Sequence, residues 1–255
     1  MSDSIRVEIA GRRATVTLAR PPLNILDLEV LAELEARFAE IAEIPDLQLV
    51  VVAGEGGKAF SAGVSIHDHT PDKIDRMLLG FHGALGRLRA LEALTVAAVD
   101  GHCLGGGMEL ACCCDLVVAS ERSRFGQPEI QLGCFPPVAA ALLPRRIGAA
   151  ATLELLLSGR TLGAAEALSL GLVSRVVADG EVEGEIERIA EWLLGRSAVA
   201  TRIIKRAVRA GEERPLPAAL KEAERLYLRD LAASADMREG IEAFLAKRPA
   251  EWKHR

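Results

Sequence analysis

The stretch VDGHCLGGGMEL, residues 99–110, joins the end of an apolar run, three consecutive glycines and the first turn of an apolar helical pattern. Glycine lets the backbone approach a ligand closely, and the first amides of a helix have no partner inside it. The helix dipole adds a partial positive charge at the same place. The stretch therefore predicts an α/β protein in which a buried strand leads into a helix start that accepts negative charge.

The spacing of these glycines excludes two common phosphate sites. A dinucleotide fingerprint requires G-x-G-x-x-G and a P-loop requires G-K-[ST], and neither pattern surrounds Gly105, Gly106 and Gly107. We therefore expect the site to hold a partial negative charge, such as a carbonyl oxygen that becomes an enolate. Tight packing of a helix on a strand is the alternative reason for the three glycines.

A second glycine-containing loop, GKAFSAGVSI at residues 57–66, also follows an apolar run. Two such loops at the ends of neighbouring parallel strands can each offer one amide to the same oxygen. That is the geometry of an oxyanion hole, in which one donor typically contributes ~10²–10³ in rate, or ~3 kcal/mol.

Two glutamates stand in apolar surroundings beside these loops. Glu109 follows the glycine run, and Glu129 lies in FGQPEI, residues 125–130. Two carboxylates close together do not easily both ionise, so one keeps a proton and the pair supplies an acid and a base. A glutamate considered alone is more often an exposed or salt-bridged residue, and the functional interpretation depends on the combination with the two glycine loops.

Outward from these motifs, apolar periodicity and turn residues predict strands that alternate with helices, and hence parallel crossovers. Asp27 suits an N-cap, and the pattern after residue 149 is mostly helical. We predict a core over residues 1–196 and a helical lobe over 197–255 that packs on a partner. The predicted strands are 5–10, 14–19, 47–53, 95–99, 116–119 and one near 172–177; the predicted helices are 27–43, 74–91, 108–114, 181–194, 199–210, 216–232 and 237–246.

Composition restricts the class of protein. The 255 residues are half hydrophobic and carry a formal charge of −5 with both signs dispersed, so neither a membrane helix nor a nucleic-acid surface is expected. The five cysteines match no zinc spacing, and we expect no metal. The two histidines and the aspartate at His67, Asp68 and His69 could suggest a metal site. They lie in a polar segment with no further ligand in view, so we expect them on a solvated loop. The N-terminal six residues lack a signal-peptide core, so we expect the cytoplasm.

Four motifs together resemble the enoyl-CoA hydratase/isomerase (crotonase) family, over essentially the whole chain. They are KAFSAGV from Lys58, AVDGHCLGGGME from Ala98, FGQPE from Phe125, and LGAAEA to GLV over residues 162–173. The resemblance implies an α/β fold of the crotonase type, a spiral of ββα turns with a C-terminal helical trimerisation lobe. It also implies a homotrimer or a dimer of trimers.

The resemblance assigns roles to the motif residues. The amides of Val64 and Gly106 would bind the thioester oxygen of an acyl-CoA substrate. Glu109 and Glu129 would hold a water molecule and shuttle its protons. The activity implied is that of a hydro-lyase, which adds water to an enoyl-CoA double bond through an enolate.

The resemblance also implies where the CoA would lie. The backbone around Ala62 and Ile66 would meet its adenine, and Phe244 and Lys247 of one subunit would reach the CoA of the next. No cofactor is implied beyond the CoA moiety of the substrate.

Two stretches depart from the common family pattern. One is RPPLNILD, residues 20–27, and the other is GCFPPVAAA, residues 133–141, whose Cys134, Phe135, Pro136 and Pro137 we expect to line the acyl pocket. Both resemble the cyclohexa-1,5-diene-1-carbonyl-CoA hydratases of anaerobic aromatic degradation, which predicts a cyclic dienoyl thioester as substrate. An ordinary 2-enoyl-CoA hydratase, an enoyl-CoA isomerase and a non-catalytic acyl-CoA-binding subunit are the alternatives.

Overall fold

The computed structural model describes residues 4–255, leaving aside the side chain of Glu213. The prediction about the first six residues falls partly on residues 1–3, which lie outside the described residues. A six-stranded sheet forms the centre, with β1 antiparallel to β2 and all other neighbours parallel, as the predicted crossovers require. In sheet order, its strands are β1 (Ile5–Ala10), β2 (Arg13–Leu18), β3 (Leu49–Gly54), β5 (Leu94–Val99), β7 (Leu116–Ser120) and β10 (Arg175–Val177).

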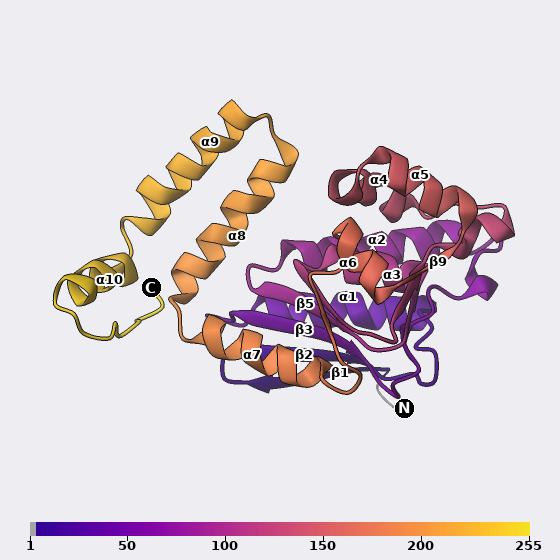
Figure 1. Ribbon diagram of the computed structural model, residues 1–255, viewed down its shortest axis with the longest axis horizontal. Coiled ribbons are helices and arrows are strands. Elements are labelled where there is room, and N and C mark those ends of the chain that lie inside the picture. The colour runs from indigo at the N-terminus through magenta and orange to yellow at the C-terminus, as the bar shows by residue number, and fades with distance from the viewer. Residues whose placement is uncertain (1–3) are drawn as a thin grey trace.

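Helices cover both faces of this sheet, so its central strands read as continuous apolar runs rather than alternating ones. In β3, Val50 and Val52 face the core that includes α1 (Leu28–Ala42) and α2 (Ile74–Ala90). Leu49 and Val51 of the same strand face the opposite way, onto α7 (Val182–Leu194). Figure 1 shows α1 and α2 on one side of the strands and α7 on the other.

The predicted cap of the first helix is confirmed. Oδ1 of Asp27 accepts a hydrogen bond from the amide of Val30 at 3.0 Å, which satisfies one of the amides that α1 leaves unpaired. The apolar stripe of α1, at Leu34 and Phe38 among others, is fully buried.

A second, four-stranded sheet was not predicted. Each of its strands has three residues, too few to show an alternating pattern. Because β4 and β6 pair in parallel, the loops that follow them leave the sheet side by side. The strands are β4 (Ala59–Ser61), β6 (His102–Leu104), β8 (Arg124–Gly126) and β9 (Thr161–Gly163), in that order.

Some of the remaining helices differ from the predictions at their ends. The helix predicted at 108–114 begins two residues earlier, the strand predicted near 172–177 covers only β10, and the helix predicted at 216–232 changes to a π-helix at Leu226. These elements are α3 (Gly106–Cys113), the 3₁₀ turns η1 (Ile66–Asp68) and η2 (Pro128–Leu132), α4 (Pro137–Ile147), α5 (Ala149–Ser158), α6 (Ala164–Leu170), α8 (Ala198–Glu213), α9 (Leu216–Arg225), η3 (Leu226–Leu231) and α10 (Ala235–Leu245). Of these, α4, α5, α6 and the two 3₁₀ turns had no individual prediction.

The helices α8, α9 and α10 project away from the core (orange to yellow in Figure 1). Ser197 caps α8, and Lys205 and Arg209 of that helix form ion pairs with the carboxylate of Asp115. The boundary between residues 196 and 197 stays a prediction. Apolar side chains on these helices are at least half exposed: Ile204, Val208, Leu216, Leu220, Tyr227, Leu228, Ile241, Phe244 and Leu245. Within residues 4–255, no helix combines the length and apolar character that crossing a bilayer requires.

Candidate functional site

A cavity of about 330 Å³ opens where the loops after β4 and β6 meet η2 and the start of α4. Most residues predicted from the sequence line it, although they come from segments far apart in the chain. These are Ala62, Val64, Ile66, Gly106, Glu109, Glu129, Cys134, Phe135, Pro136 and Pro137. Phe244 and Lys247 do not line this cavity, because they belong to the projecting lobe (Figure 1). Their role in a neighbouring subunit stays a prediction.

Two backbone amides converge at the cavity. A bridge between Leu26 and Val64 uses the carbonyl of Gly63 and the amide of Ser65, each at 3.0 Å from Leu26, so the amide of Val64 faces away from Leu26. A Cβ built on Gly106 would lie 3.3 Å from the nitrogen of Val64. Neither of these two amides has a hydrogen-bond acceptor within the described part of the chain. The pair therefore has the arrangement needed to hold one oxygen atom.

Close contacts explain two of the three glycines. Gly107 allows tight packing, because a Cβ there would lie 2.4 Å from the carbonyl oxygen of Ser61. Gly105 has a φ of 53°, a left-handed conformation that favours glycine, and a Cβ there would lie 2.9 Å from Oε1 of Glu129. Gly105 thus leaves space for the carboxylate at the cavity wall.

Glu109 lies in the first turn of α3 and is only 4% exposed. Its Oε1 accepts a hydrogen bond of 2.8 Å from the amide of Ala139. Burial raises the pKa of Glu109 to about 7, and the negative charge of Glu129 contributes in the same direction, whereas the hydrogen bond from Ala139 opposes the rise. The carboxyl group is thereby poised to give or take a proton near neutral pH.

Glu129 lies in η2, half-buried against the same cavity. Burial raises its pKa, and the nearby charge of His69 opposes the rise. In the amide orientation that satisfies both groups, the buried Gln127 donates to both carboxylate oxygens, at 3.1 and 3.0 Å. Glu129 is therefore held in place by a neighbour two residues earlier.

The Pro136–Pro137 segment forms a wall of the cavity and also begins a helix. Pro137 is the first residue of α4, a position that requires no amide hydrogen. The first-turn amide of Ala139 then points at Glu109. Cys134 lies beside Glu129, with its thiol 3.4 Å from the carbonyl oxygen of Glu129, and Phe135 is two-thirds exposed.

Sequence reasoning missed His69. The expectation of a solvated loop fits His67 but is wrong for its two neighbours. Asp68 is only 6% exposed and accepts from the amide of Leu28 at 3.2 Å, while His69 lines the cavity. No local sequence signal marks His69; in the structure, the 3₁₀ turn over residues 66–68 brings the chain back to the cavity. Within residues 4–255, no group of three potential metal ligands gathers here or elsewhere.

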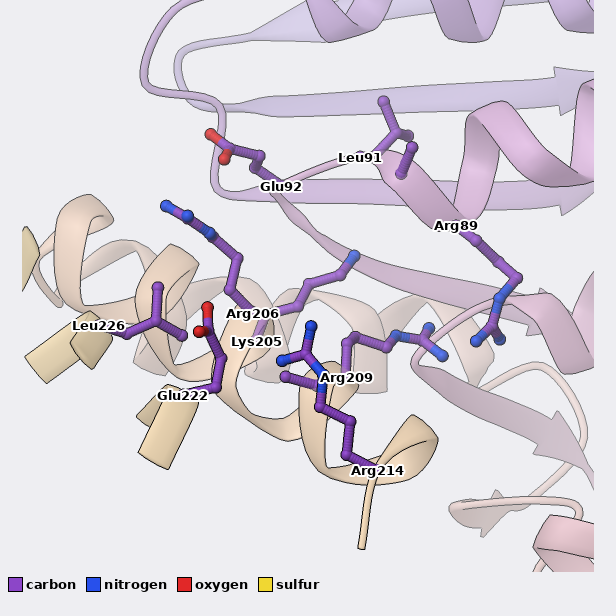
Figure 2. Close-up of a pocket in the computed structure, with 11 residues that line it drawn as sticks. Arg89, Leu91, Glu92, Lys205, Arg206, Arg209, Arg214, Glu222 and Leu226 are labelled. Carbon is purple, nitrogen blue, oxygen red and sulfur yellow. The ribbon is translucent and has the colours of Figure 1, made fainter. Parts of the chain in front are cut away.

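A second cavity, of about 380 Å³, lies between the C-terminal end of α2 and the helices α8 and α9. Figure 2 shows Lys205, Arg206 and Arg209 projecting from the lobe toward Arg89 and Glu92 of the core. Four of its cations form ion pairs with acids: Lys205 and Arg209 with Asp115, Arg206 with Asp230, and Arg89 with Glu212. We interpret this cavity as the joint between core and lobe rather than as the reactive site.

Comparison with known proteins gives a consistent result. Residues 9–255 match the family model described as enoyl-CoA hydratase/isomerase. The chain is 37% identical to a cyclohexa-1,5-dienecarbonyl-CoA hydratase from Thauera aromatica, over 98% of this chain and 96% of that protein. It is 40% identical to a probable enoyl-CoA hydratase from Rhizobium meliloti, over 99% of each chain. A solved enoyl-CoA hydratase structure from Geobacillus kaustophilus superposes with a TM-score of 0.96, at 30% identity, over 100% of this chain and 98% of the other.

Proposed function

Because the chain belongs to the enoyl-CoA hydratase/isomerase family, with hydratases among its relatives, we propose that this hydro-lyase acts on a cyclic dienoyl-CoA thioester. The substrate proposed is cyclohexa-1,5-diene-1-carbonyl-CoA, to which the enzyme adds water. The observation that carries the chemistry is the meeting of two unpartnered amides and two carboxyl groups of raised pKa at one cavity.

In the proposed reaction, the amides of Val64 and Gly106 bind the thioester oxygen. Water adds to the electrophilic carbon, and the thioester oxygen carries the negative charge of the resulting enolate. One of the two glutamates accepts a proton from the water. The other donates a proton to a carbon of the enolate, and this step completes the addition. Oxyanion donors of this kind typically contribute ~10²–10³ in rate and acid–base groups ~10²–10⁴.

The cyclic substrate is supported by two observations. The Thauera aromatica relative bears that activity in its name, and the Pro136–Pro137 wall departs from the common family pattern. An aromatic-degradation role would follow from that substrate. An ordinary 2-enoyl-CoA hydratase is the second candidate, because relatives of similar identity carry that description, including a crotonyl-CoA hydratase at 33% identity.

The oligomer proposed is a homotrimer or a dimer of trimers. The exposed apolar side chains of α8, α9 and α10 are the observation that supports it, since a surface of this kind is typical of an interface. Phe244 and Lys247 would then lie near the CoA of a neighbouring subunit, while the backbone at Ala62 and Ile66 would meet the adenine in its own subunit.

One assay separates the two substrate candidates. The specificity constant is measured with cyclohexa-1,5-dienecarbonyl-CoA and with crotonyl-CoA on the same preparation. A constant at least tenfold higher for the cyclic substrate supports the proposal. Faster turnover of crotonyl-CoA assigns the ordinary hydratase, and tight CoA-ester binding without turnover of either substrate assigns a non-catalytic subunit.

A further inference from the structure

We propose that His69 is a positioning residue, which lines the same cavity as Glu109 and Glu129 and biases this pair toward the arrangement in which Glu109 carries the proton. The inference rests on the proposed hydratase function, since it concerns the same pair of carboxyl groups. His69 belongs to neither glycine loop and to neither glutamate segment, so none of the motifs in the sequence points to it.

The first support is the fixed orientation of the imidazole ring. Nδ1 of His69 lies 2.9 Å from the carbonyl oxygen of Ser65. A carbonyl oxygen only accepts hydrogen bonds, so Nδ1 carries the hydrogen and donates it. Nε2 is then the nitrogen left for the cavity. It accepts a hydrogen bond when the ring is neutral and donates one when the ring is protonated.

The second support is the rigid base from which His69 projects. The preceding residue, Asp68, is buried and bonded to the amide of Leu28, and it forms an ion pair with Lys73 at 3.4 Å. Asp68 and Lys73 therefore offset each other's charge. The bond to Leu28 anchors the 3₁₀ turn η1 to the start of α1, and the ion pair with Lys73 connects it to the start of α2, so His69 is presented to the cavity from a fixed base.

The third support is an asymmetry between the carboxyl groups. The titratable groups that face Glu129 are His69 after η1, Glu109 in α3 and Cys134 after η2. Only His69 can bring a positive charge, and its charge lowers the pKa of Glu129 against the effect of burial. Glu109 has no such cation among the groups that set its pKa.

This asymmetry has a direct chemical consequence. Burial favours the proton at Glu109, whereas the charge of His69 and the two hydrogen bonds from Gln127 favour the carboxylate form of Glu129 against the effect of burial. His69 therefore biases the pair toward one of its two protonation arrangements before substrate enters. Loss of His69 would let the proton divide more evenly between the two glutamates.

Two substitutions separate the ring contacts. His69→Asn keeps a donor near the position of Nδ1 for Ser65 and removes Nε2, whereas His69→Gln places a polar group near Nε2 without the charge. The matched control is His67→Asn, because His67 is exposed and two residues away. We expect the acidic limb of the kcat/KM profile to move up by about one pH unit in His69→Asn, which gives about a tenfold loss at acidic pH and little loss at alkaline pH. His69→Gln retains part of the wild-type profile, and His67→Asn all of it.

The protonation of Glu129 can also be measured without turnover, so that this second test does not depend on the identity of the substrate. The carboxyl stretch of protonated Glu129 is assigned by infrared difference spectroscopy as the band absent from Glu129→Gln, and its titration is followed in wild type and in His69→Asn. A midpoint at higher pH in His69→Asn supports the inference. An unchanged midpoint overturns it, even where kcat falls. Absence of hydration in wild type overturns the proposed function instead, and leaves the infrared titration to decide on His69.

Discussion

The amide of Ala139 donates a 2.8 Å hydrogen bond to Oε1 of Glu109, thirty residues earlier in the chain. This contact connects the first turn of α4 to the first turn of α3 at the wall of the cavity. It explains how the unusual Pro136–Pro137 segment bears on the chemistry, because Pro137 begins the helix that supplies the amide. The segment therefore positions the carboxyl group of Glu109 and also lines the cavity in which the acyl group is proposed to bind.

The buried carboxyl of Glu109 makes stability depend on pH. Its pKa is about 7 in the folded protein and near the usual 4.5 in the unfolded chain, so the folded state holds more protons between these values. Its stabilising contribution is fully present below pH 4.5 and is lost as the pH rises through about 7, an effect of about 3 kcal/mol.

Glu109→Gln removes this dependence. We expect the free energy of unfolding of the variant to fall less than that of wild type between pH 4.5 and pH 8, measured by urea denaturation at fixed protein concentration. Equal losses in the two proteins would show that Glu109 is not held protonated by burial.

Gly106→Ala tests the oxyanion site. The added methyl would lie 2.7 Å from Cγ2 of Val64 and 3.3 Å from its amide nitrogen, in the space assigned to the thioester oxygen. We expect kcat/KM to fall ~10²–10³-fold. The control is Gly86→Ala, on an exposed face of α2, where a Cβ meets nothing within 4 Å. A Gly106→Ala enzyme as active as Gly86→Ala would place the oxygen elsewhere.

Asp115 joins the core to the lobe. Its carboxylate accepts from the amide and hydroxyl of Thr95, both at 2.8 Å, and pairs with Lys205 and Arg209, whose side chains are mostly buried. Asp115→Asn leaves Lys205 without its counter-charge and leaves Arg209 with Glu212 alone, and breaking a buried pair typically costs ~3–5 kcal/mol. We expect faster proteolysis near residues 197–213 and a lower free energy of unfolding.

The matched control for this prediction is Asp230→Asn. Asp230 pairs with Arg206 at 3.5 Å in a more exposed place, where an ion pair contributes ~0–1 kcal/mol. Equal effects of the two substitutions would contradict the conclusion that the ion pairs of Asp115 hold the lobe to the core.

Much of the fold could be predicted because it is encoded locally. The side chain of Asp27 bonds to an amide only three residues further along the chain. The continuous apolar runs of β3 and β5 are typical of buried strands. The two glycine loops and both glutamates were also readable, since each carries its chemistry in a short motif.

The rest depended on contacts between distant segments. The strands of the second sheet have three residues each and exist only because they pair with one another. The bond from Ala139 to Glu109 spans thirty positions and leaves no local pattern. His69 looked like a polar loop residue because nothing in its immediate neighbours shows that one 3₁₀ turn directs it inward.

Removal of either reactive carboxyl group should stop hydration without preventing binding. We expect Glu109→Gln and Glu129→Gln each to lower kcat by at least ~10²-fold, with the dissociation constant for a saturated acyl-CoA little changed. Fluorescence titration with that acyl-CoA provides the control. Wild-type rates in both variants would remove the two glutamates from the mechanism.

The most direct test of the account follows the oxygen of the solvent. Wild-type protein is incubated with an enoyl-CoA or cyclic dienoyl-CoA thioester in water enriched in oxygen-18, and the product is analysed by mass spectrometry. We expect a hydroxyacyl-CoA carrying one solvent oxygen, formed by wild type and not by Glu109→Gln or Glu129→Gln. A rearranged enoyl-CoA that exchanges its α-proton but contains no oxygen-18 would contradict the account and identify an isomerase.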